Sequence, residues 1–140
     1  MIRGAARILL GLFLLVAGTA HLTVARDAFR AQVPTWFPAD ADAVVVVSGV
    51  VEIVLGLALV ALVRHRALVG LVVAAFFVAI FPGNVAQFVE GRSAFGLDTD
   101  AARGVRLLFQ PVLVAWALWC TGAWELLRRN SRRARTRPRS

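Results

Sequence analysis

The sequence predicts an all-α integral membrane protein, folded as an antiparallel four-helix bundle with both termini in the cytoplasm. Of its 140 residues, 59% are hydrophobic, and the mean hydropathy is +0.74. A soluble domain of this size needs a larger share of polar residues to cover its surface. The apolar residues also gather in four long stretches, and arginine is distributed unequally among the segments between them.

Each apolar stretch is long enough to cross a bilayer as a helix. A helix rises ~1.5 Å per residue, so about 20 residues span a hydrocarbon core of ~30 Å. The predicted spans are residues 5–25, 43–63, 67–89 and 104–126. Together they form one domain, residues 1–126, and leave no room for a soluble module.

The first span also has features of a secretory signal. Basic residues precede it, and the small residues from Gly18 to Ala20 could form a cleavage site. The apolar run continues to Ala25, however, beyond the length of a typical signal core. We therefore expect a retained helix, with cleavage as the alternative.

Arginine predicts the orientation of the helices. It precedes the first span, separates the second from the third and follows the fourth, whereas the other two loops mix acidic and basic residues. Cytoplasmic loops carry the excess of basic residues in membrane proteins. Both termini are thus expected in the cytoplasm, with the protein in a bacterial plasma membrane.

The net charge of +8 comes largely from residues 127–140, half of which are arginine. Because this tail also contains proline and serine and follows a span directly, we expect it to be disordered and drawn to anionic lipid headgroups. Nucleic acid is not an expected partner.

Glu52 is the most informative single residue. It lies in the middle of the second span, where an ionisable group costs several kcal/mol unless it is paired or neutralised. In the predicted orientation, every span brings a hydrogen-bonding side chain to the outer half of the bundle. The predicted ligand-binding cluster is His21, Glu52, Asn84, Arg106 and Gln110.

Glycine and proline support this cluster. Gly49 and Gly56 share a helical face with Glu52, and Gly11 and Gly18 share one with His21. Small residues on membrane helices mark close helix contacts, so these faces should point inward. Further along the chain, Pro82 lies before Asn84, and Pro111 follows Gln110. Each proline frees a carbonyl group, which is tolerated in a membrane beside a polar cavity.

We expect Glu52 to form an ion pair with Arg106, with His21 and Gln110 completing the shell. Several structural alternatives stay open. Arg106 could extend to the headgroups, the ion pair could lack chemistry, His21 could cap its helix, and Asn84 and Gln110 could only join helices.

The motifs around these residues resemble those of the DoxX family of small four-helix membrane proteins. They are Gly18-Thr-Ala-His21, Val33-Pro-Thr-Trp-Phe-Pro38, Ser48-Gly-Val-Val-Glu-Ile53, Phe81-Pro-Gly-Asn84 and Arg106-Leu-Leu-Phe-Gln110. Leu108 stands where many relatives have proline, and Gly83 where alanine is common. The resemblance implies a four-helix membrane bundle, and some members are linked to quinone-dependent sulfur oxidation or membrane redox complexes.

Two classes of function follow. The first is the membrane subunit of a quinone- or sulfur-linked redox complex, with a quinone near the polar cluster and near aromatic residues such as Phe81 and Trp116. The second is a non-enzymatic assembly factor, accessory subunit or small-solute carrier.

A redox role would require a partner protein. Cys120 is the only cysteine, which excludes a dithiol couple within the chain. His21 and His65 fall on opposite membrane faces, which excludes a bis-histidine haem. We expect no metal site, no intrinsic cofactor and no catalysis by the chain alone.

Overall fold

The computed structural model describes residues 1–94, 96 and 99–135, with side chains through Ser131. In this part of the chain all regular structure is helical. The helices are α1 (Ile2–Leu22), α2 (Arg26–Arg30), α3 (Ala41–Ala61), η1 (Val63–His65), α4 (Arg66–Val89), α5 (Asp100–Thr121) and α6 (Ala123–Arg135).

Four of these helices are long and apolar enough to cross a membrane, namely α1, α3, α4 together with η1, and α5. The predicted all-α membrane bundle is therefore confirmed. The largest difference in span limits is at the end of the fourth span, predicted at residue 126 and observed at Thr121.

The end of α5 explains that difference. Gly122 adopts a left-handed conformation with φ of 77°, and its N–H donates to the Trp119 carbonyl oxygen. Glycine reaches this conformation without the steric cost that a Cβ atom brings, and it commonly ends helices in this way. The fourth span therefore stops at a helix cap, and α6 starts in a new direction.

The prediction of a disordered tail from residue 127 is wrong through Arg135, because α6 continues to that residue. Arginine is a good helix former, and the sequence Trp124-Glu-Leu-Leu127 gives the start of α6 an apolar component that composition alone concealed. The rest of the predicted tail, residues 136–140, lies outside the described residues.

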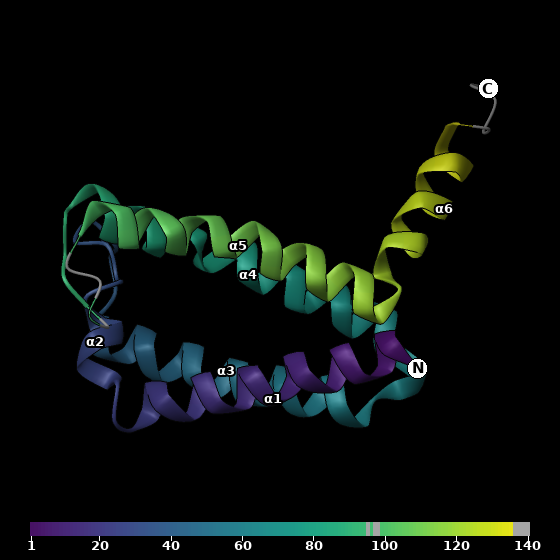
Figure 1. Ribbon diagram of the computed structural model, residues 1–140, viewed down its shortest axis with the longest axis horizontal. Coiled ribbons are helices and arrows are strands. Elements are labelled where there is room, and N and C mark those ends of the chain that lie inside the picture. Colours follow the sequence, from purple (N-terminus) through teal and green to yellow (C-terminus); the bar gives the residue numbers. More distant parts are fainter. Residues whose placement is uncertain (95, 97–98, 136–140) are drawn as a thin grey trace.

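The four long helices form two layers (Figure 1). Helices α1 and α3 pack against each other in one layer, and α4 and α5 in the other. Met1 and the start of α6 lie at one end of the bundle, here called the terminal end, and α2 lies at the opposite end, here called the α2 end. The chain thus enters the first span and leaves the fourth at the same end of the bundle, as the span count requires. That this side is cytoplasmic stays a prediction.

Glycine brings α1 and α3 into close contact. A Cβ atom on Gly11 would lie 2.9 Å from the Gly56 carbonyl oxygen, and one on Gly18 would lie 2.5 Å from the Gly49 carbonyl oxygen. Backbones this close leave no room for any other residue type. The glycine-lined faces predicted for the first two spans are therefore in contact.

The apolar core occupies the terminal half of the bundle. It contains leucine from α1 and α3, and valine, alanine, phenylalanine and cysteine from α4 and α5. Its buried members are Leu10, Leu14, Leu55, Leu59, Val69, Val73, Ala74, Phe77, Ala117 and Cys120. In the same half, Gly70 of α4 lies directly against Thr121 of α5.

Candidate functional site

The α2 half of the bundle contains a cavity of about 720 Å³, lined by residues from α1, α2, α3, α4 and α5. All five side chains of the predicted cluster, His21, Glu52, Asn84, Arg106 and Gln110, line this cavity. They come from four different helices, α1, α3, α4 and α5, and the fold brings them around a single space.

His21 and Glu52 form an ion pair across the contact between α1 and α3. The His21 Nδ1 atom lies 3.1 Å from the Glu52 Oε2 atom, and both side chains are buried. The glycine contact beside them explains this distance, because a Cβ atom on Gly49 would lie 2.7 Å from the His21 Cβ atom. The close helix packing therefore fixes the two side chains in position.

The proton on His21 Nδ1 points away from Glu52. This nitrogen lies 2.9 Å from the Ala17 carbonyl oxygen. A carbonyl group only accepts hydrogen bonds, so Nδ1 carries the proton and donates it there. The Glu52 Oε2 atom is buried and has no hydrogen-bond partner among the described residues. Glu52 is thus held beside an imidazole and retains an unused acceptor within the cavity wall.

Helix α2 supplies an aromatic ring to this pair. The Phe29 ring stacks on the His21 imidazole with their centroids 3.3 Å apart and an angle of 17° between the planes. Arg26, also on α2, pairs with Asp42 at the start of α3, and this hydrogen bond raises the pKa of Arg26. The short helix is therefore tied to α3 and orients His21 through Phe29. This role could not be predicted from the sequence, because a five-residue helix shows no useful periodicity.

A second polar group joins α4 and α5. Asn84 Nδ2 donates to Gln110 Oε1 at 2.9 Å, and Gln110 Nε2 donates to the Phe77 carbonyl oxygen at 2.6 Å. Pro82 lies within α4 between these two partners. Gln110 thus bonds a backbone carbonyl group of α4 shortly before Pro82, which is the kind of polar contact expected beside a proline in a membrane helix.

The predicted ion pair between Glu52 and Arg106 is wrong, because the ionisable partner of Glu52 in the described structure is His21. Arg106 belongs to α5, in the opposite layer, and it lines the same cavity. Depth in the membrane suggested Arg106 as the partner of Glu52. The contact between α1 and α3 instead brings His21 next to Glu52.

A loop between α2 and α3 closes one side of the cavity. Gln32, Val33, Pro34, Trp36 and Phe37 belong to its lining. Both terminal nitrogens of the Arg92 guanidinium group donate to the Val33 carbonyl oxygen at 3.1 Å.

Arg92 is itself held in place. It pairs with Glu90 at 2.7 Å, and its backbone carbonyl oxygen accepts a hydrogen bond from Gln87 Nε2 at 3.3 Å. Arg92 therefore connects the end of α4 to the loop between α2 and α3. No sequence pattern singled this residue out, because it follows the third span in a loop of mixed charge.

The aromatic residues around the cavity differ from those predicted. Those that line it are Phe13, Phe29, Trp36, Phe37, Phe77 and Phe109. Phe81 and Trp116 are not part of its lining. Trp116 lies in the terminal half, where its Nε1 donates to the Ala6 carbonyl oxygen at 3.1 Å. In the described residues, no three His, Cys, Asp or Glu side chains are grouped as a metal site would require.

These observations define a small multi-pass membrane protein with a polar cavity between its two helix layers. A family model described as a domain of unknown function (DUF8561) matches residues 10–121, and the chain belongs to this family. The matched region contains every residue that lines the cavity. No curated protein and no solved structure matches the chain. The resemblance to DoxX stays a prediction, since the matched family carries no link to it.

Proposed function

We propose that this protein binds a quinone in the cavity at the α2 end and acts as the membrane subunit of a redox complex. The observation that carries the proposal is the convergence of five polar side chains from four membrane helices on one cavity. Polar groups inside a membrane bundle are costly and mark ligand or ion sites.

The size and composition of the cavity suit a quinone headgroup. Small-molecule sites are typically ~300–1,000 Å³, mostly apolar, with a few polar groups that fix orientation. This cavity, of about 720 Å³, has aromatic and aliphatic walls and a limited polar set. A planar ring with two carbonyl groups would have aromatic surfaces to pack against and the Arg106 guanidinium group as a hydrogen-bond donor.

Glu52 and His21 supply the proton-handling groups of the proposed site. A carboxyl group can take up and release a proton, and the His21 imidazole lies 3.1 Å from that of Glu52. Glu52 belongs to the cavity lining, which would place its carboxyl group beside a ligand hydroxyl group. In this proposal, Glu52 accepts or releases a proton at the ligand while His21 balances its charge.

Electrons would have to come from another protein. The chain has a single cysteine, Cys120, which is buried in the terminal half and lines no part of the cavity. The proposed complex therefore includes a redox partner that carries the electron-transfer group. The resemblance to DoxX-like proteins agrees with such a role.

Binding of a short-tailed ubiquinone analogue to the protein in lipid nanodiscs tests the proposal. Trp36 lines the cavity, and quinones quench tryptophan fluorescence, so quenching should saturate with ligand. Glu52→Gln should weaken binding about tenfold or more, because a hydrogen bond to a charged group contributes ~1.5–3 kcal/mol. Trp36→Phe should remove most of the saturable signal.

Glu125→Gln is the matched control, since Glu125 lies at the terminal end, outside this cavity. It should bind the analogue as tightly as the unmodified protein does. Absence of saturable quenching, or equal binding by the Glu52 and Glu125 variants, would overturn the proposal.

A second function is favoured by the contact of Asn84 with Gln110. Asn84 donates a hydrogen bond to Gln110, and Gln110 donates one to the Phe77 carbonyl oxygen. Hydrogen bonds of this kind are what a purely structural connection between two helices requires. A non-enzymatic accessory subunit, assembly factor or small-solute carrier would use the cavity without redox chemistry. Quinone binding separates it from the first proposal.

A further inference from the structure

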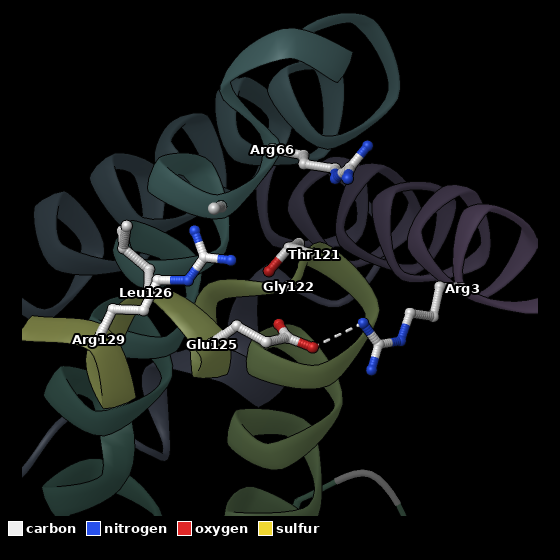
Figure 2. A pocket seen from close by; sticks show the side chains of 8 residues that line it. Arg3, Arg66, Thr121, Gly122, Glu125, Leu126 and Arg129 are labelled. Atoms are coloured by element: carbon white, nitrogen blue, oxygen red, sulfur yellow. Dashed lines mark hydrogen bonds and ion pairs between the residues drawn. The ribbon is translucent and has the colours of Figure 1, made fainter. Parts of the chain in front are cut away.

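A second cavity lies at the terminal end, where segments far apart in the sequence meet. It has a volume of about 320 Å³ and is lined by residues of α1, α4, α5 and α6 together with Gly122. Three arginines surround it: Arg3 of α1, Arg66 of α4 and Arg129 of α6 (Figure 2). These positions lie near the start, middle and end of the chain, so the fold alone creates the cluster.

The cavity has an excess of positive charge. Three arginines and one glutamate line it, which gives a net charge of 3 − 1 = +2. Glu125 accepts a hydrogen bond from Arg3 at 2.8 Å, and this bond lowers the pKa of Glu125, so its carboxylate offsets Arg3 at neutral pH (Figure 2). In the described part of the chain, neither Arg66 nor Arg129 forms an ion pair with a carboxylate.

The starts of two helices add to the positive potential of the cavity. Helix α4 begins at Arg66 without a side-chain cap, and α6 begins at Ala123, directly after Gly122 in the cavity wall. The first amide groups of a helix carry partial positive charge and favour an anion nearby. The arginines and the two helix starts therefore favour the same kind of ligand.

The surroundings of the cavity are those of a membrane surface. Trp119 and Trp124 are 44% and 51% exposed, and Leu126 and Leu127 of α6 are also exposed. Tryptophan gathers at the level of the lipid headgroups. A helix with exposed apolar residues and several arginines, as α6 has, is typical of one that lies in the interface.

We propose that this cavity binds the phosphate group of an anionic phospholipid, held by Arg66 and Arg129 between α1, α4 and α6. Guanidinium groups bind phosphate oxygens through charge-assisted, often bidentate hydrogen bonds. A lipid is the occupant rather than a soluble phosphate because the cavity lies at the ends of the membrane helices, where acyl chains can follow the exposed apolar residues. The site is distinct from diffuse attraction by the arginine-rich tail, and it does not depend on the quinone proposal.

Native mass spectrometry of the full chain, titrated with phosphatidylglycerol in detergent, tests this site. Arg66→Gln combined with Arg129→Gln should weaken lipid binding about 25-fold, since each basic residue at a membrane surface contributes ~1 kcal/mol, or about fivefold. The control combines Arg64→Gln with Arg128→Gln, which removes the same charge from positions outside the cavity lining. It should bind nearly as tightly as the unmodified protein.

A gain of affinity provides an independent check. Glu125→Gln should tighten binding, because it removes the carboxylate that pairs with Arg3, and a misfolded variant would not show this gain. Equal losses in the two double variants would overturn the proposal in favour of diffuse attraction. If inorganic phosphate forms a mass adduct that displaces the lipid and depends on Arg66 and Arg129, a soluble phosphate is the ligand and the lipid assignment is wrong.

Discussion

The two halves of the bundle use the same four helices in different ways. In the terminal half, leucine, valine and phenylalanine fill the space between the layers, with Leu10 and Leu14 fully buried. In the α2 half, the same layers enclose a cavity of about 720 Å³. Its lining combines aromatic side chains such as Phe13 and Phe109 with short or polar ones such as Ser48 and Asn84.

The contact within the first layer does not differ between the halves. Gly11 meets Gly56 in the terminal half, and Gly18 meets Gly49 in the α2 half, at similarly short distances. The cavity therefore does not arise because α1 and α3 separate. It lies between the two layers, which are further apart at the α2 end than at the terminal end (Figure 1).

Substitution of the glycines between α1 and α3 should have the largest effect, and it should disrupt folding equally in both halves of the bundle. Gly49→Leu and Gly56→Leu should each abolish the folded protein, because even a Cβ atom would lie 2.7 Å from the nearest atom of α1. Val50→Leu, on an exposed position of α3, is the control. Thermal melting in detergent and size-exclusion chromatography measure the effect. If Gly49→Leu behaved like Val50→Leu, the shared close contact would be wrong.

The next largest effect concerns the pair of His21 and Glu52. Substitution of His21 should lower stability, whereas substitution of Glu52 should not. His21→Leu leaves the buried Glu52 carboxyl group without its imidazole partner and should cost ~3–5 kcal/mol of the free energy of unfolding. Glu52→Gln removes a buried charge whose Oε2 atom has no described hydrogen-bond partner, so stability should be unchanged or higher.

Chemical unfolding in detergent micelles measures both variants. The double variant should lose less than the sum of the two single losses, because the two side chains contact each other. Equal losses from His21→Leu and Glu52→Gln would show that the pair stabilises the fold rather than preparing a site.

The smallest expected effect is the difference in stability loss between two leucine-to-alanine substitutions, one in each half of the bundle. Leu14→Ala, in the filled half, should cost ~2–5 kcal/mol, as is usual for a fully buried leucine. Leu113→Ala, at the wall of the cavity, should cost about 1–2 kcal/mol, because its side chain already has fewer neighbours to lose. The same unfolding experiment measures both. Similar losses at the two positions would mean that the α2 half is as tightly packed as the terminal half.

Much of this arrangement could be predicted from the sequence. Hydropathy located the four spans, and helical periodicity placed the glycines of the first two spans on facing surfaces. Depth within each span placed His21, Glu52, Asn84, Arg106 and Gln110 in the same half of the bundle, and all five line one cavity. These properties follow from the period and rise of a helix, which a single sequence contains.

The partner of Glu52 could not be predicted in the same way. Depth does not show which helices are neighbours, so Arg106 and His21 were both possible partners until α1 was placed beside α3. The contributions of Phe29 and Arg92 come from short segments with no periodicity. The helical part of the tail was missed because half of residues 127–140 are arginine, and this composition was taken to indicate disorder.

The connectivity of the two layers has a consequence for how the protein is assembled. Each layer consists of consecutive spans, α1 with α3 and α4 with α5, so each is a hairpin that is complete before it needs the other. His21 pairs with Glu52 inside the first hairpin, and Asn84 bonds with Gln110 inside the second. Each hairpin therefore shields its own polar groups from lipid during insertion, and the cavity forms only when the two hairpins dock.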